Sequence, residues 1–312
     1  MRYPNKLLKG GTVGLVAPSS PISEEKRERC IQKIKDLGYR VKVASNLSEN
    51  YGGYMAGDGP QRAKELNSMF EDAEVDAVFC VRGGAGGSRI MPYVDFELIK
   101  KNPKIFVGYS DITSLHLAIN RHCDLVTFHG PMVSSDMIDD FDEETSTSFF
   151  EAINAEDSYV YANPKGREIE VLSEGTARGR MTGGNLALLS ASIGTFYELD
   201  CKDRILFIEE VGEEIDRLER FAFHLKNAGK LDQCRGILLG QFTKCNNKNR
   251  PEYDAIECFK DILRGINIPV MYHIESGHGH PMMTLPMGAY CSMDTRTKTL
   301  YFEKPVRMEK VE

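Results

Sequence analysis

KIFVGYSDITSLHL, residues 104–117, joins an apolar run to a helical pattern through a short polar corner. Ile105–Val107 is a β-rich apolar run that ends at Gly108, which predicts a buried strand. Over residues 113–120 the apolar side chains recur at helical spacing. A strand that turns sharply into a helix raises the corner residue above the helix N-terminus, where its hydroxyl is accessible. The stretch therefore points to Ser110 as a nucleophile.

A second interpretation of this corner is purely structural. Ser110 and Asp111 are both residue types that cap helix N-termini well. The nucleophile signature G-x-S-x-G is also incomplete, because Ile112 stands where the second glycine would be. Taken alone the stretch favours a cap, so the choice depends on the rest of the chain.

The composition is that of an ordinary soluble globular protein, with 312 residues, 41% apolar and 27% charged. This length allows two domains or one large one. No apolar run approaches the ~20 residues that span a bilayer, and the N-terminus has no signal-peptide pattern, so we expect a cytoplasmic protein without a membrane partner. A net charge of -7 disfavours a nucleic-acid partner. Eight cysteines without a C-x-x-C pair indicate buried or incidental thiols in a reducing compartment.

The N-terminal half predicts a parallel sheet. Thr12–Ala17 and Tyr39–Ala44 read as strands on either side of a helix over Ser23–Leu37, which is a β-α-β unit. A third buried strand, Ala77–Val81, leads directly into the glycine-rich loop 82–89. Because ligands of open α/β sheets sit outside the carboxyl ends of strands, we expect this loop to lie beside Ser110. The loop fits no nucleotide-phosphate pattern, which leaves an oxyanion or anion role and a flexible turn as alternatives.

The second half reads as another mixture of helices and strands. The composition shifts in the acidic, polar region 134–165, where one helical piece is expected near Phe149–Ile153. Arg204–Ile208 and Gly236–Phe242 are apolar runs typical of buried strands, with an amphipathic helix over Ile215–Ala228 between them. The tail alternates polar and apolar residues, as antiparallel strands do.

A serine nucleophile needs a base, and the base needs a carboxylate that orients it. Of the seven histidines, His278 stands between two glycines in a short loop that would expose its ring, and His280 is its chief competitor. Glu209 and Glu210 follow the apolar run of one strand, and only one of them can face the site because side chains alternate. The residues alone leave both choices open. No acidic or cysteine partner lies at metal-ligand spacing, so we expect no metal.

Eight blocks of sequence, spread along nearly the whole chain, match one enzyme family in order. They are VAPSSP at 16–21, GYMAGDGPQRAKEL at 53–66, RGGAGGSRI at 82–90, GYSDITSLHLAI at 108–119, TFHGPM at 127–132, GGNLALLSASIGT at 183–195, ILFIEEVGEEIDRLER at 205–220 and SGHGHPMMTLPMG at 276–288. Through these blocks the sequence resembles the LD-carboxypeptidases, or muramoyltetrapeptide carboxypeptidases, serine peptidases that include the microcin C immunity hydrolases.

The resemblance implies which residues carry the chemistry. In this family the serine of G-[YF]-S-D is the nucleophile, the first acid after the apolar strand orients the histidine, and the histidine of G-H-G is the base. Carried over to this sequence, these are Ser110, Glu209 and His278. The oxyanion would be held by the backbone N–H groups of Asp111 and of Gly83 or Gly84.

The glycine-rich loop also carries the substrate-binding expectation. Arg82 and Arg89 are the nearest cationic side chains by sequence for a substrate carboxylate, and Arg82 is placed in the substrate site. One residue departs from the family, because Ala85 stands where many relatives carry a bulky aromatic residue. The departure concerns the shape of the substrate pocket and not the triad.

The fold implied by the resemblance is α/β, with an N-terminal parallel-sheet α/β domain and a C-terminal mixed α/β barrel-like domain. The first, residues 1–163, would carry the nucleophile, and the second, residues 182–312, would carry the acid and the histidine. Residues 164–181 would form the linker. The active site would then lie in the cleft between the domains.

The activity implied is hydrolysis of the L,D-peptide bond to the terminal D-alanine of murein tetrapeptides, through an acyl-enzyme and without a cofactor. A homodimer is also expected from the family. One alternative is an immunity-type hydrolase that cleaves an acyl or peptidyl–nucleotide conjugate, for which a stacking aromatic residue, often tryptophan, is expected. The chain has no tryptophan, and its 164–182 bridge is short. Another alternative is a muropeptide-binding protein without activity, which would need no triad.

Overall fold

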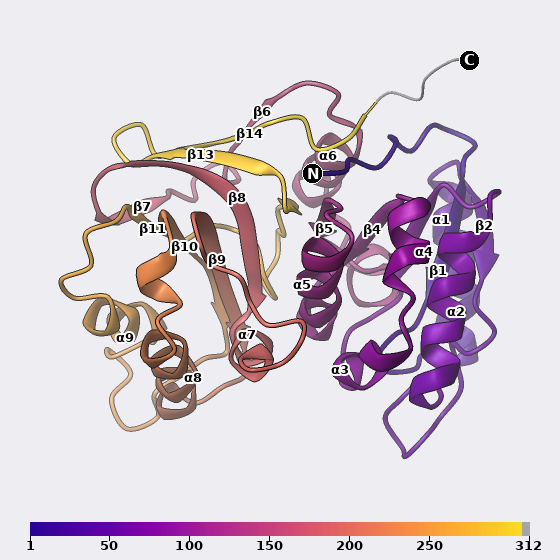
Figure 1. Ribbon diagram of the computed structural model, residues 1–312, viewed down its shortest axis with the longest axis horizontal. Helices are drawn as coiled ribbons and strands as arrows, with labels where there is room; N and C mark the ends of the chain where they lie inside the picture. The colour runs from indigo at the N-terminus through magenta and orange to yellow at the C-terminus, as the bar shows by residue number, and fades with distance from the viewer. Residues whose placement is uncertain (308–312) are drawn as a thin grey trace.

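The computed structural model describes residues 1–307 and contains two β-sheets with helices packed against them. Figure 1 shows the two sheets side by side, with the N-terminal half of the chain in indigo and purple and the C-terminal half in brown, orange and yellow. Each sheet is mixed, because it contains both parallel and antiparallel pairs of strands. The predicted α/β class is therefore confirmed.

The first sheet has six strands in the order β12-β5-β4-β3-β1-β2. All neighbours run parallel except β12, which comes from the C-terminal part of the chain and pairs antiparallel with β5. The strands are β1 (Thr12–Val16), β2 (Arg40–Val43), β3 (Ala77–Cys80), β4 (Ile105–Gly108), β5 (Thr127–His129) and β12 (Leu285–Met287).

The helices of this half of the chain begin where the sequence supplies caps. Ser23 accepts a hydrogen bond from the Lys26 N–H at the start of α1, and Asp58 does the same for α2. Strands β1, β3 and β4 are buried along their whole length, as continuous apolar runs predict. The helices are α1 (Glu24–Asp36), α2 (Gly59–Glu71), α3 (Gly87–Ile90), α4 (Phe96–Lys101), α5 (Thr113–His122) and α6 (Glu143–Asn154).

The second sheet has eight strands in the order β6-β14-β13-β8-β9-β10-β11-β7. The four central strands β8 to β11 are parallel, and the flanking strands are antiparallel. The strands are β6 (Tyr159–Tyr161), β7 (Glu170–Ser173), β8 (Thr176–Asn185), β9 (Arg204–Val211), β10 (Gly236–Thr243), β11 (Val270–Tyr272), β13 (Tyr290–Asp294) and β14 (Thr299–Phe302).

Helices α7 (Leu186–Ser192), α8 (Ile215–Asn227) and α9 (Ala255–Ile262) cover one face of this second sheet. The side chains of β9 divide between the two faces in strict alternation. Leu206 and Ile208 belong to the apolar core under these helices, whereas Ile205 and Phe207 belong to the core on the opposite face. The next two residues of β9 are therefore expected on opposite faces as well.

Most of the predicted elements are present with ends shifted by one or two residues, but two regions differ. The helix expected near Phe149–Ile153 is the longer α6, and the strand expected over Arg204–Ile208 continues to Val211, so that Glu209 and Glu210 lie within β9. The segment 164–181 contains β7 and the first part of β8. The domain boundaries at 163/164 and 181/182 stay a prediction.

Helix α5 joins the two halves of the molecule. Leu117 of α5 is part of the apolar core under α7 and α8, and the backbone N–H of Asn185 donates to Thr113 Oγ1 at 3.1 Å. Gly184 is needed at this contact, because its φ is +132° and a Cβ there would lie 2.6 Å from Thr113 Oγ1. The end of β8 therefore sits on the first turn of α5, directly after the serine corner.

One further feature follows the sequence expectations. All eight cysteines are buried free thiols. Within residues 1–307, the helices are too short or too polar to cross a bilayer.

Candidate active site

Ser110 lies at the point where β4 turns into helix. We call residues 108–113 the serine corner: β4 ends at Gly108, a 3₁₀ turn spans Ser110–Ile112, and α5 begins at Thr113. Ser110 has φ +64°, a left-handed conformation that non-glycine residues rarely adopt and that is typical of strained nucleophile turns. Neither the 3₁₀ turn nor α5 has a side-chain cap, so the capping interpretation of Ser110 and Asp111 is wrong.

The glycine-rich loop lies against this corner, as predicted. A Cβ on Gly83 would be 2.9 Å from Ser110 Cβ and 3.0 Å from Ser110 Oγ, so only glycine fits there. Asp111 Oδ2 accepts hydrogen bonds from the Gly87 N–H at 2.7 Å and from Ser19 Oγ at 2.6 Å. The Asp111 carboxylate therefore ties together the loops that follow β1, β3 and β4.

The backbone N–H groups of Gly83 and Gly84 make no hydrogen bond to any residue between 1 and 307. Gly84 has φ +118°, and Ser20 supports the loop by accepting from the Ala85 N–H at 3.2 Å. Unpaired N–H groups beside a serine hydroxyl are suited to hold an oxyanion.

Arg62 supports these loops, a role that no pattern in the sequence indicates. Its side chain is 1% exposed and donates to the backbone carbonyls of Pro18, Gly57 and Gly86. A guanidinium can satisfy several carbonyls at once because it has five donors in a fixed plane.

His278 and Glu209 are paired. His278 Nδ1 lies 2.6 Å from Glu209 Oε2, and Glu209 is fully buried. Because a carboxylate only accepts, Nδ1 carries the proton of the neutral ring, and Nε2 of that form keeps its lone pair. The other oxygen of Glu209, Oε1, is buried without a partner among the described residues.

Glu210 points to the opposite face of β9, as the alternation requires. Its carboxylate accepts from Asn185 Nδ2 at 2.7 Å and from the backbone N–H groups of Ala187 and Val211 at 2.8 Å. It therefore joins β9 to the first turn of α7 and does not contact His278.

The ring of His278 lies on the serine corner. The Tyr109 and His278 ring centroids are 4.8 Å apart, with the planes at 66°. The Tyr109 hydroxyl donates to Asp136 Oδ1 at 3.0 Å, and His280 Nε2 lies 3.7 Å from the same oxygen. Ser110 Oγ makes no hydrogen bond to His278 in this arrangement. Catalytic hydrogen bonds are often longer in ligand-free enzymes and tighten when substrate binds.

The charges around His278 favour its protonated form. Burial lowers the pKa of His278, but the charge and hydrogen bond of Glu209, with smaller contributions from Glu210 and Asp136, outweigh burial and raise the pKa above its ordinary value. By contrast, burial holds the pKa of His129 well below its ordinary value, so this ring is neutral.

His129 is one of several residues near the site that sequence reasoning did not place. Both of its ring nitrogens are buried without a hydrogen-bond partner in the part of the chain that the structure describes. Its ring lies 5.8 Å from that of Tyr109. Asp136 was also missed, since it stands in an acidic stretch that reads as solvated surface. The π-helical turn that holds Asp136, Val133–Met137, is a geometry frequent at functional sites.

The predicted arginines are less closely bound to the site. Arg82 is exposed, and Arg89 lies over the Tyr51 ring at 5.3 Å. Neither makes a hydrogen bond or ion pair with Ser110 or His278. Their substrate role stays a prediction.

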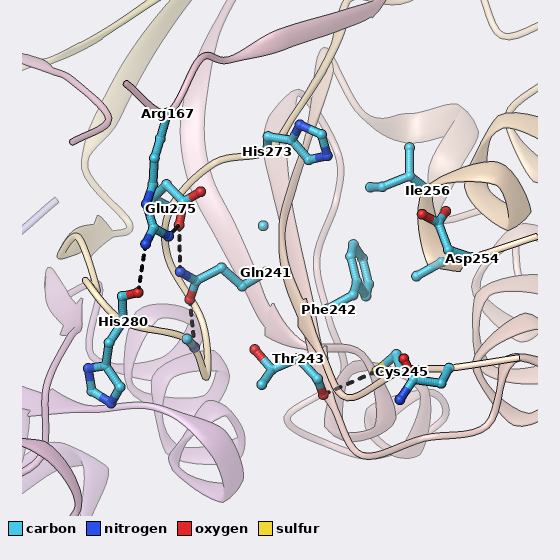
Figure 2. A pocket seen from close by; sticks show the side chains of 14 residues that line it. Arg167, Gln241, Phe242, Thr243, Cys245, Asp254, Ile256, His273, Glu275 and His280 are labelled. Carbon is cyan, nitrogen blue, oxygen red and sulfur yellow. Dashed lines mark hydrogen bonds and ion pairs between the residues drawn. The ribbon is translucent and has the colours of Figure 1, made fainter. Parts of the chain in front are cut away.

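A pocket of about 430 Å³ lies beside the loop that carries His278 (Figure 2). Its lining includes Arg167, Gln241, Glu275 and His280, together with residues from the end of β10 and the start of α9. Within residues 1–307 there is no group of three or more histidine, cysteine, aspartate or glutamate side chains arranged to hold a metal ion.

Comparison with known proteins gives a consistent result. The model of the LD-carboxypeptidase N-terminal domain matches residues 13–130, and that of the LD-carboxypeptidase C-terminal domain matches residues 178–293. A probable murein peptide carboxypeptidase of Bacillus subtilis is 39% identical over 308 residues, covering 97% of this chain and 95% of the relative. A murein tetrapeptide carboxypeptidase of Pseudomonas aeruginosa is 30% identical over 284 residues, covering 89% and 91%.

The fold has solved counterparts too. The wild-type apo structure of the microcin C7 self immunity protein MccF superposes with a TM-score of 0.91 at 24% identity, covering 98% of this chain and 100% of that one. At this identity the likeness speaks for the fold. Together with the two domain matches and the relative at 39% identity, it shows that the chain belongs to the LD-carboxypeptidase family of peptidases.

Proposed function

We propose that this protein is a serine carboxypeptidase that hydrolyses the L,D-peptide bond to the terminal D-alanine of murein tetrapeptides. The observation that carries the proposal is the buried Glu209–His278 pair, which lies against the corner that presents Ser110. A serine in a strained turn, a histidine with one free nitrogen and a buried carboxylate are the three parts of a nucleophilic hydrolase.

The first step is attack on the substrate carbonyl. Nε2 of His278 takes the proton of Ser110 Oγ while the oxygen bonds to the carbonyl carbon. Glu209 holds Nδ1–H and stabilises the imidazolium that forms. The N–H groups of Gly83 or Gly84 and of Asp111 stabilise the oxyanion, at about 3 kcal/mol per donor.

The second half of the reaction returns the enzyme to its starting state. The C–N bond of the tetrahedral intermediate breaks, and His278 gives its proton to the leaving amine of D-alanine. Water then attacks the acyl-enzyme, with His278 as base, and Ser110 Oγ leaves with the proton. The products are a tripeptide with a free carboxylate and D-alanine.

The substrate class comes from the names of the relatives, two of which are carboxypeptidases of murein peptides. A conjugate of the microcin C type is the alternative substrate, since MccF shares the fold. The chain has no tryptophan on which a nucleobase could stack, which favours the murein peptide.

The test is the change Ser110→Ala. We expect release of D-alanine from a purified murein tetrapeptide to fall by about 10⁴-fold or more, because the nucleophile is removed. The thermal unfolding curve is expected to stay close to that of the wild type. D-alanine is measured by mass spectrometry, in parallel with hydrolysis of an acyl-sulfamoyl adenylate.

The matched control is Ser135→Ala, because Ser135 is exposed. It should retain full activity. If the wild-type protein cleaves only the adenylate, its substrate is the nucleotide conjugate and not the murein peptide. If the Ser110→Ala variant keeps wild-type activity, the serine mechanism is excluded.

A further inference from the structure

The backbone around His278 is held by side chains and not by a sheet or helix. We call residues 276–281 the histidine loop; it lies between β11 and β12 and has no helical or strand structure. A loop without its own regular hydrogen bonds needs outside partners for its N–H and C=O groups. Most of the partners found come from one residue, Gln241 in β10.

Gln241 binds the histidine loop at three points. Its backbone N–H donates to the Ser276 carbonyl at 3.0 Å. Its side-chain Oε1 accepts from the Gly279 N–H at 2.7 Å, and Nε2 donates to the Pro281 carbonyl at 3.1 Å. These contacts lie on both sides of His278 in the sequence, so one residue sets the position of the loop that bears the base.

The orientation of the Gln241 amide is fixed by chemistry. The Gly279 N–H is a donor, so the atom facing it has to be the carbonyl oxygen. The amide nitrogen then faces two acceptors, the Pro281 carbonyl and Glu275 Oε2 at 2.8 Å. Both N–H bonds of the amide and its oxygen are used, which leaves a single rotamer that satisfies all partners.

The same network continues to the pocket beside the loop (Figure 2). Glu275 Oε2 also accepts from Arg167 Nη1 at 2.8 Å, and Arg167 Nη2 donates to the His280 carbonyl at 3.1 Å. Figure 2 shows these side chains together at one wall of the pocket. Arg167 thus adds an outer, more exposed bond to the loop.

The histidine loop also packs closely against its neighbours. A Cβ on Gly279 would lie 2.8 Å from Gln241 Cδ, and a Cβ on Gly277 would lie 3.1 Å from Glu209 Oε2. Gly277 has φ +136°. Both glycines therefore allow the loop to approach Gln241 and Glu209 closely.

From these contacts we propose that Gln241 is a positioning residue for the reaction, one that fixes the imidazole of His278 against Glu209 and toward Ser110. It does not touch the reacting atoms. The inference rests on the proposed role of His278 as the base. Placement matters because a shift of about 1 Å in a catalytic group can lower the rate about 100-fold.

The test is Gln241→Met, which keeps an unbranched side chain of similar length and removes the amide without changing the charge. We expect kcat for D-alanine release to fall about 10- to 100-fold, with KM within about twofold, because binding groups are untouched. The pKa of His278 is expected to fall, because a displaced loop weakens the Glu209 contact that raises it. Nitrogen NMR of histidine-labelled protein measures that pKa without any need for activity.

The matched control is Gln233→Met, because Gln233 is exposed and lies outside the site. It should keep the kcat and the His278 pKa of the wild type. A Gln241→Met protein that is folded, with wild-type kcat and an unchanged His278 pKa, would overturn the proposal even if its thermal stability is lower.

Arg167→Met is the second variant, and it decides the matter if Gln241→Met does not fold. Arg167 is 44% exposed at its side chain, so its loss should leave folding intact. A smaller fall in kcat, about two- to tenfold, and a shift of the His278 pKa in the same direction support the network. No change in either would contradict it.

The outcomes also separate this inference from the proposed function. If the wild type releases no D-alanine but Gln241→Met still lowers the His278 pKa, the positioning is supported and the function is wrong. If the wild type is active and the pKa and kcat do not respond to Gln241→Met, the function stands and the positioning is wrong.

Discussion

Ser110 stands where a buried parallel strand turns into a helix, whereas His278 stands in a loop without regular structure. The serine corner is fixed by the main chain: β4 is buried, and the φ of Ser110 follows from the sharp turn into α5. The histidine loop is fixed by side chains that reach it from β9 and β10, chiefly Glu209 and Gln241.

This difference predicts how each part responds to substitution. At the serine corner a substitution should act through steric clashes, because the loops there are in close contact and are held by buried hydrogen bonds. At the histidine loop a change should act through hydrogen bonding and charge. The two parts meet at the contact between the Tyr109 and His278 rings.

Glu209→Gln should cause the largest effect on the histidine side. The side-chain amide at position 209 can then donate to Nδ1, which favours the tautomer with the proton on Nε2 and removes the proposed base. We expect kcat to fall by about 10⁴-fold. Thermal stability should be kept or raised, because the carboxylate is fully buried and has one unpaired oxygen. Steady-state kinetics and thermal unfolding measure the two effects.

Glu210→Gln is the matched control, one residue along the same strand. Its carboxylate accepts three hydrogen bonds, and an amide replaces one acceptor by a donor. The free energy of unfolding is expected to fall by about 1–3 kcal/mol, with a far smaller loss of kcat than in Glu209→Gln. The reverse result, in which Glu210→Gln loses activity and Glu209→Gln keeps it, would mean that Glu210 and not Glu209 is the orienting acid.

The pH dependence of activity provides a second test of the Glu209–His278 pair. In the proposed mechanism the imidazole of His278 has to be neutral, so kcat/KM should rise as the pH passes the pKa of His278. Burial lowers this pKa, but Glu209 together with Glu210 and Asp136 raises it more, so the acid limb in the wild type should lie above the ordinary value of about 6.5. In Glu209→Gln the limb of any residual activity should move to lower pH.

Gly83→Ala tests how the serine corner responds to a steric clash alone. The φ of Gly83 is not positive, so alanine adds no backbone strain. Its methyl group would lie 2.9 Å from Ser110 Cβ and 3.4 Å from the Asp111 N, which displaces the proposed nucleophile and crowds the proposed oxyanion donors. We expect kcat to fall about 10²- to 10³-fold, as when an oxyanion donor is lost.

The control for this change is Ser88→Ala in the same loop, whose side chain is exposed. It should keep kcat within about threefold of the wild type, as exposed substitutions away from special features do. A Gly83→Ala enzyme with full activity would show that the loop can move away from Ser110 without loss, and that the corner is less rigid than its packing indicates.

The same difference explains how much the sequence could predict. The serine corner depends on local patterns, an apolar strand followed by helical spacing, so its position and the neighbouring glycine loop could be derived from the residues. Alternation along β9 showed that Glu209 and Glu210 face opposite ways, but not which face meets His278. That choice came from the family resemblance.

Other parts of the site depend on contacts between residues far apart in the sequence. Gln241 ends an apolar run and reads like any polar strand end, since its partners in the histidine loop lie 38 and 40 residues away. Arg62 reads as a surface residue of a helix, yet it is buried among three backbone carbonyls. No local pattern contains such information, because the hydrogen bonds exist only after the sheets have formed.

His280→Gln should have the smallest effect, and it tests whether the histidine loop presents one base or two. His280 is 39% exposed and lies 3.7 Å from Asp136 Oδ1, a contact that is too long for a strong hydrogen bond. Its carbonyl, which Arg167 binds, is unchanged by the substitution. We therefore expect kcat to stay within about threefold of the wild type, as for other exposed changes, with the acid limb of the pH profile in place. A loss comparable to that of Glu209→Gln would mean that His280 and Asp136, and not His278 and Glu209, form the working pair, and kinetics of the two variants side by side decides between them.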